Sequence, residues 1–136
     1  GCLMNPVVHF ELPYEDRERM ASFYQQTFGW QAQMLGPEMG NYVVVMTTES
    51  DESTGFPKEA GRINGGLYEK SDVNHSPSVV IAVDDIRESM KKLEEAGGKV
   101  VGGRQPGEPD EIPGVGLYIA FTDSEGNRLS LLQPAR

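Results

Sequence analysis

The chain has 136 residues and a mass of 15.0 kDa, enough for one domain that folds without a disulfide or a structural metal. Its 12 Lys and Arg stand against 21 Asp and Glu, a formal net charge of -9, and no local cluster of basic residues offsets it. A nucleic-acid backbone or an anionic membrane surface would be repelled, so neither is expected as a partner.

The only cysteine is Cys2, so no intrachain disulfide forms and a reducing compartment is indicated. Residues 1–3 precede Met4 and would fit an expression scar, so Cys2 is given no role. No apolar run approaches the roughly 20 residues of a membrane span, and no charged-then-apolar leader precedes the expected fold. The cytoplasm is therefore the expected location.

The first half of the chain predicts a strand, a helix and three further strands. The helix begins at Asp16 with acidic residues in its first turn, and Gly29 ends it. β-branched and aromatic residues mark the strands. These are expected over residues 6–13, 30–34, 41–47 and 62–68. A polar loop over residues 49–61 precedes the last of them.

The second half predicts the same order of elements. A buried strand over residues 78–83 leads to a helix, which Asp84 or Asp85 would cap and which Gly97 and Gly98 stop. A short strand follows over residues 99–101, then an acidic loop rich in Gly and Pro over residues 102–116. The tip of this loop, Asp110-Glu111, is expected to be solvated. Two strands joined by a tight turn close the chain, over residues 117–122 and 128–133.

This repetition predicts one α+β domain over residues 4–136, made of two βαβββ modules, about 5–70 and about 77–134. The helix ends at Gly29 and Gly97 mark the same position in each module. The alternative is two unrelated α+β segments in a ferredoxin-like or other mixed fold. The helix side chains Met20, Phe23, Phe28 and Met90 are expected to pack against the sheet.

Stretches in both halves of the chain resemble a known superfamily. His9-Phe10-Glu11-Leu12-Pro13, then Phe23-Tyr24 and Phe28-Gly29-Trp30, are similar to the first strand and helix of the glyoxalase, bleomycin-resistance and extradiol-dioxygenase superfamily, also called vicinal-oxygen-chelate proteins. Val83-Asp84-Asp85-Ile86 and the turn Asp123-x-x-Gly126-Asn127 resemble its second module. The resemblance implies two βαβββ modules whose sheets curl into an open cup, with the helices on the outer face.

In enzymes of this superfamily the cup holds a divalent metal on four inward-facing residues, commonly His and Glu. Carried over by position, these fall on His9, on Gly65 or Gly66, on Ser78 and on Ser130. Serine is a poor ligand beside imidazole or carboxylate, and glycine has no side chain. The resemblance therefore implies a scaffold with His9 as the residual metal position and no intact metal site, so no cofactor is expected, although a divalent metal is possible.

His9 and Glu11 lie two residues apart and so share one face of their strand. We interpret them as the candidate catalytic residues, with His9 as a residual ligand, a general base or a hydrogen-bond donor to substrate. The alternative is a strand histidine whose ring nitrogens are satisfied locally. Both residues are expected to line the cup.

A second group of residues would supply an apolar pocket with a few polar groups, the usual composition of a small-molecule site. The aromatic members have core packing as the alternative role. The candidate substrate-binding residues are Trp30, Tyr42, Asn64, Ser78, Phe121 and Ser130.

The function predicted from the sequence is binding of a small organic molecule, by a homodimer, without an intact metal site. The acidic surface would suit a cationic ligand. One alternative is a metal-dependent lyase, isomerase or dioxygenase that uses His9 on a small oxygenated substrate. Another is an interaction module whose cup is closed by core side chains.

Overall fold

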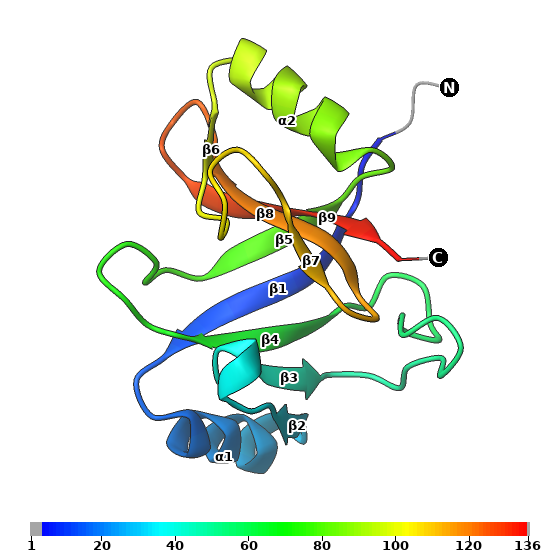
Figure 1. Cartoon of the computed structure of the whole chain (residues 1–136). Coiled ribbons are helices and arrows are strands. Elements are labelled where there is room, and N and C mark those ends of the chain that lie inside the picture. Colours follow the sequence, from blue (N-terminus) through cyan, green and yellow to red (C-terminus); the bar gives the residue numbers. More distant parts are fainter. Residues whose placement is uncertain (1–3, 136) are drawn as a thin grey trace. The chain divides into compact units, whose positions relative to one another are not determined.

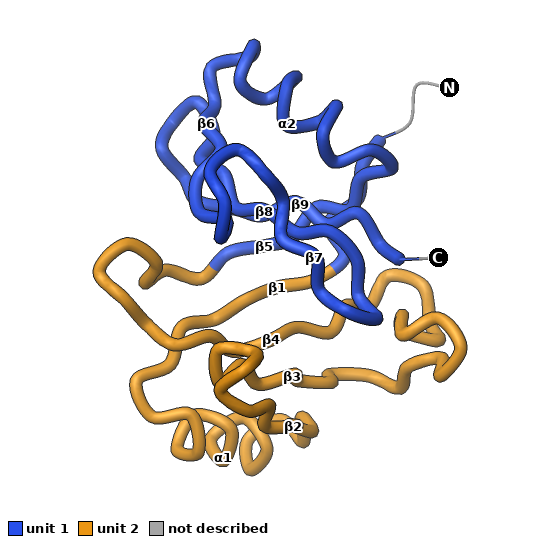
Figure 2. Tube along the Cα trace, viewed as in Figure 1, with its two compact units in different colours: residues 1–8, 78–136 blue, residues 9–77 orange. Residues whose placement is uncertain are grey.

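The computed structural model describes residues 4–135, and its contacts divide these into two units (Figure 2). Unit 2 runs from residue 9 to residue 77, and unit 1 joins residues 4–8 to residues 78–135. Cys2 lies outside the described residues. No described helix is long and apolar enough to cross a membrane.

Unit 2 contains four strands and one long helix (Figure 1). In chain order the elements are β1 (Val7–Tyr14), α1 (Arg17–Phe28), β2 (Gln31–Met34), the 3-10 turn η1 (Pro37–Met39), β3 (Val43–Met46) and β4 (Asn64–Glu69). The first two residues of β1 belong to unit 1, and the strand belongs to unit 2 from His9 onward. The strands lie in the order β2-β3-β4-β1, and the β1–β4 pair is parallel while the others are antiparallel.

Unit 1 repeats this arrangement with one extra strand (Figure 1). Its elements are β5 (Ser78–Ala82), α2 (Ile86–Glu95), β6 (Lys99–Val101), β7 (Asp110–Ile112), β8 (Gly116–Thr122) and β9 (Arg128–Pro134). The order β6-β8-β9-β5 matches that of unit 2, with β5–β9 as the parallel pair. The prediction of an α+β fold built from two βαβββ modules is therefore confirmed.

One prediction about the loop over residues 102–116 is wrong in part. Asp110 and Glu111 were expected at a solvated loop tip, but they lie in β7, which pairs antiparallel with β8. Glu111 is exposed as expected, whereas Asp110 is half-buried. Its half-buried carboxylate accepts a hydrogen bond from the backbone N–H of Arg104 at 2.9 Å. The strand is only three residues long and lies among Gly and Pro residues, so its sequence carries no periodic signal.

Strand alternation gives the sheet of each unit one face that packs on a helix and one that does not. In unit 2 the helix-side face holds the buried core of Tyr14, Val43, Val45 and Leu67, with Met20 of α1 packed against it. In unit 1 the equivalent face packs on α2. Its core consists of Val83, Ile86, Met90, Ile119, Phe121 and Leu131.

Two of the helix side chains expected in the core are exposed instead. Phe23 is 55% exposed and Phe28 is 63% exposed, whereas Met90 of α2 is buried as predicted. The apolar residues of α1 are spread around the helix, so a single sheet face covers only some of them.

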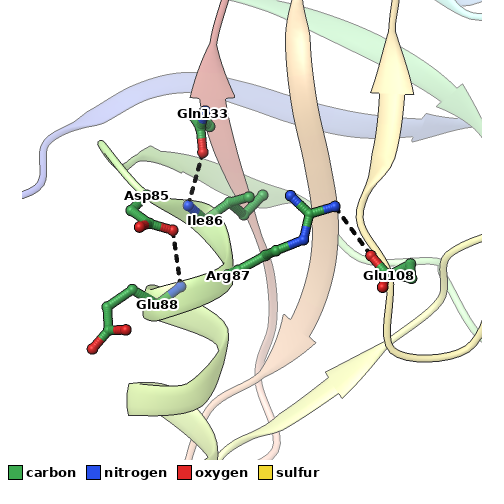
Figure 3. A network of polar contacts seen from close by, with 6 residues as sticks. All are labelled: Asp85, Ile86, Arg87, Glu88, Glu108 and Gln133. Carbon is green, nitrogen blue, oxygen red and sulfur yellow. Dashed lines mark hydrogen bonds and ion pairs between the residues drawn. The ribbon is translucent and has the colours of Figure 1, made fainter.

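Each long helix begins with an aspartate cap. Asp16 accepts from the N–H of Arg19, and Asp85, rather than Asp84, accepts from the N–H of Glu88. Figure 3 shows a second hydrogen bond at the start of α2, in addition to the Asp85 cap. The side-chain oxygen of Gln133 on β9 accepts from the N–H of Ile86 at 3.0 Å. The ion pair between Arg87 and Glu108 in the same view is exposed on both sides and contributes little.

We predict that Asp16→Ala and Asp85→Ala each lower the free energy of unfolding by about 1 kcal/mol, because each leaves a backbone N–H of the first turn without its cap. Urea unfolding of the two single variants measures this. Glu94→Ala, on the exposed side of α2, is the control and should change stability by less than about 0.5 kcal/mol. Equal effects of cap and control variants would contradict the capping role.

Candidate functional site

A polar cluster lies on the face of the unit 2 sheet that α1 does not cover. The parallel register places His9 beside Asn64 and Glu11 beside Gly66. Because successive side chains alternate, His9 and Glu11 point away from the core face that carries Phe10 and Leu12. Glu11 is 7% exposed, which is unusual for a carboxylate without a partner.

Tyr42 joins these two residues through its hydroxyl. The hydroxyl donates to Oε2 of Glu11 at 2.9 Å, and its oxygen lies 3.1 Å from Nε2 of His9. A carboxylate only accepts, so the single phenolic proton is directed to Glu11. The phenolic oxygen is then left to accept, which assigns a proton to Nε2 of His9 and leaves the lone pair on Nδ1.

Burial governs the charge of this cluster. Removal from water lowers the pKa of His9 from its usual 6.5 to about 4, because burial disfavours the imidazolium. His9 is therefore neutral near pH 7 and carries one donor and one acceptor nitrogen.

Gly66 supplies the space that the phenol ring occupies. A Cβ built at Gly66 would come within 1.8 Å of the Tyr42 hydroxyl oxygen and 2.1 Å of the adjoining ring carbon. Glycine in the middle of a strand marks a close approach of another group, and here that group is the Tyr42 ring. The sequence showed only a weakened strand at this position, although the Gly65-Gly66 pair was the signal that could have identified a packed side chain.

The remaining predicted site residues of unit 2 make other contacts. Asn64 lies beside His9 in the register, but its amide holds the end of β3, accepting from the N–H of Thr47 at 2.8 Å and donating to Ser50 at 2.7 Å. Trp30 packs with the core on the helix side, where it stacks on Tyr24 at 4.5 Å. The structure thus brings His9, Glu11 and Tyr42 together. Asn64 and Trp30 instead make contacts that support the fold.

In unit 1 the predicted residues divide between the two faces of the sheet. Ser130 is 3% exposed, and its hydroxyl lies 2.7 Å from the Tyr118 hydroxyl on the face away from α2. Ser78, half-buried on β5, has the strand parity of Val80, which pairs with Ser130. Phe121 lies in the core under α2.

A separate hollow of about 500 Å³ lies on unit 2 near Tyr14, Glu69 and His75. Its charged side chains are exposed. The Tyr14 hydroxyl donates to the carbonyl of Asn41 at 2.7 Å, and burial and the charge of Glu69 raise its pKa. Unlike the His9 cluster, this hollow has no buried carboxylate among the side chains that line it.

The sequence matches the profile of the Glyoxalase/Bleomycin resistance protein/Dioxygenase superfamily over residues 7–131. The chain belongs to this superfamily. No curated protein matches it.

Several solved structures share the superfamily fold. A methylmalonyl-CoA epimerase from Streptomyces coelicolor, in complex with 2-nitronate-propionyl-CoA, superposes with a TM-score of 0.67 at 15% identity, covering 98% of this chain and 96% of the epimerase. The Mycobacterium tuberculosis epimerase gives 0.62 at 14% identity, covering 96% and 88%. A hypothetical protein from Bacillus halodurans gives 0.66 at 13% identity, covering 98% and 97%. At these identities the likeness shows the fold.

The residues present do not fit the divalent-metal centre that superfamily membership implies. Of the carried-over positions only His9 has a strong ligand side chain, and its Nε2 is bonded to the Tyr42 hydroxyl. Gly66 is covered by the Tyr42 ring, and the Ser130 hydroxyl is bonded to Tyr118. Within residues 4–135, no group of three or more His, Cys, Asp or Glu side chains is arranged to hold a metal ion.

Proposed function

We propose that this superfamily member binds a small organic molecule at the His9–Tyr42–Glu11 cluster and does so without a metal. The observation that supports this is the Tyr42 hydroxyl, which bridges Nε2 of His9 and the buried carboxylate of Glu11. Small-molecule sites use a few fixed polar groups of this kind to orient a ligand. The cytoplasm, suggested by the single cysteine, is the proposed location.

The cluster favours a ligand that donates hydrogen bonds. Neutral His9 keeps the Nδ1 lone pair as an acceptor. The net charge of -9 opposes an anionic ligand at long range. A neutral or cationic molecule with hydroxyl or amino groups therefore fits best.

A thermal-shift screen of small alcohols, polyols and amines tests the proposal. A ligand at 100 times its Kd should stabilise the protein by about 2.7 kcal/mol. His9→Ala should abolish the shift, whereas Tyr24→Phe, a tyrosine variant on α1 outside the cluster, should retain it. A screen without any hit would contradict the proposal and favour an interaction module.

A metal-dependent lyase, isomerase or dioxygenase is the second candidate, favoured by the fold shared with an epimerase that acts on an acyl-CoA. Metal analysis of tag-free protein separates the two. The proposed function predicts no stoichiometric metal in the wild type. Stoichiometric Ni, Zn or Fe that disappears in His9→Ala would contradict it.

We predict that Tyr42→Phe lowers the free energy of unfolding by about 1–2 kcal/mol, because it leaves the buried Glu11 carboxylate without one of its donors. Urea unfolding at neutral pH measures the change. Tyr24→Phe is the matched control, since its ring contacts persist. Equal stability of the two variants would show that the hydrogen bonds of the Tyr42 hydroxyl do not contribute to the free energy of unfolding.

A further inference from the structure

The Tyr42 hydroxyl lies at a point on which two metal-ligand atoms converge. Its oxygen is 3.1 Å from Nε2 of His9 and 2.9 Å from Oε2 of Glu11. Imidazole nitrogen and carboxylate oxygen are ordinary ligands of Zn²⁺, which they bind at about 2.0–2.2 Å. A cation in place of the phenolic oxygen would therefore require each ligand atom to move inward by only about 1 Å.

The Tyr42 side chain reaches this point by crossing a strand. Tyr42 directly precedes β3, whereas His9 and Glu11 belong to β1, and β4 lies between these two strands (Figure 1). Gly66 of β4 pairs with Val44 of β3 and has no side chain to stop the ring. The phenol therefore passes over β4 and places its hydroxyl against the two residues of β1.

The second module contains the equivalent tyrosine in a different arrangement. Tyr118 stands two residues before Ala120, which pairs with Ser130 of the central strand β9. Tyr42 has the same relation to the residue that pairs with Gly66. The Tyr118 hydroxyl lies 2.7 Å from the Ser130 hydroxyl, a partner that glycine does not offer. The crossing to β1 thus depends on the glycine of unit 2.

We propose that the Tyr42 hydroxyl occupies the position at which His9 and Glu11 would hold a divalent cation, and so keeps the proposed ligand site free of metal. This rests on the proposed function and assigns its metal independence to one side chain. A cation would have to break both hydrogen bonds of the hydroxyl and displace the ring from Gly66. Without the phenol, neutral imidazole can carry its proton on Nδ1, which leaves the Nε2 lone pair for a metal.

Tyr42→His tests this by a gain of metal binding. Imidazole is shorter than phenol, and a Zn–N bond of about 2 Å makes up much of the difference, so the ion would lie near the present hydroxyl oxygen. Together with His9 and Glu11 the introduced imidazole completes the set of two His and one Glu that holds zinc in some enzymes. In equilibrium dialysis we expect one Zn²⁺ per chain, bound at least about tenfold more tightly than by the wild type.

Matched variants show where the ion binds. His9→Ala in the Tyr42→His background should return Zn²⁺ affinity to that of the wild type. Tyr118→His makes the same change at the equivalent position of unit 1, beside Ser130, and should leave the affinity unchanged. Tyr42→Ala removes the phenol without adding a ligand and should bind Zn²⁺ with an affinity between those of the wild type and Tyr42→His. Circular dichroism of each variant checks that the fold is retained.

The outcomes separate this proposal from the proposed function. Folded Tyr42→His and Tyr42→Ala variants that bind Zn²⁺ no more tightly than the wild type would overturn the role of Tyr42 and leave the ligand site as proposed. Stoichiometric Zn²⁺ in the wild type that His9→Ala removes would overturn both. A ligand screen without hits would contradict the proposed function alone, because metal exclusion is measured without a ligand.

Discussion

Gly66→Ala should lower the free energy of unfolding by about 1–3 kcal/mol, because the new methyl group and the Tyr42 ring cannot occupy the same space. The Cβ would lie 1.8 Å from the hydroxyl oxygen, so the ring has to leave its place between His9 and Glu11. Ligand binding at the cluster should be lost together with stability. Urea unfolding and the thermal-shift response measure the two effects.

The same substitution in a Tyr42→Ala background supplies the control. Removing the phenol ring opens the space above Gly66, so Gly66→Ala should cost much less there than in the wild type. The difference between the two backgrounds is the coupling energy of the pair. An equal loss of unfolding free energy in both backgrounds would show that the substitution disturbs the strand itself and not the packing of the Tyr42 ring.

His9 should make the protein lose stability as the pH falls from about 6.5 to about 4. Burial holds the pKa of folded His9 near 4, whereas the unfolded chain takes up a proton near 6.5. Above pH 6.5 His9 is neutral in both states and does not change the stability. As the pH falls below 6.5 the unfolded chain binds a proton that the folded protein does not, so the free energy of unfolding declines until the pH reaches the folded pKa. At about 1.4 kcal/mol per pKa unit the total loss is about 3 kcal/mol.

Urea unfolding at several pH values across this range tests the pH dependence. His9→Gln should remove this part of the slope, because glutamine does not titrate. The chain has two histidines, and His75→Gln, at an exposed position, is the control that should retain it. A slope that persists in His9→Gln would assign the acid sensitivity to the carboxylates.

The order of elements was predictable because their signals are local. Gly29 has φ of +76°, the left-handed conformation that ends α1, and an aspartate precedes each helix as a cap. The two modules were recognised because these signals recur in the same order. The strand β7 was not predicted, since it exists through pairing with β8, and a three-residue strand has no period of its own.

The site was predictable in part. His9 and Glu11 share a strand face by simple alternation, so their proximity followed from the sequence. The bridge to Tyr42 depends on a contact across more than 30 positions and on the absence of a side chain at Gly66, which spacing does not reveal. The expectation that Phe23 packs in the core was wrong because helical spacing does not show which side of α1 the sheet covers.

Heteronuclear NMR of the His9 imidazole during titration with the best hit of the ligand screen tests the central claim most directly. We predict that free His9 at pH 7 is neutral with its proton on Nε2, and that the ligand shifts its ring nitrogen signals while those of His75 stay in place. A ligand that binds tightly and leaves the His9 signals unchanged would contradict the account.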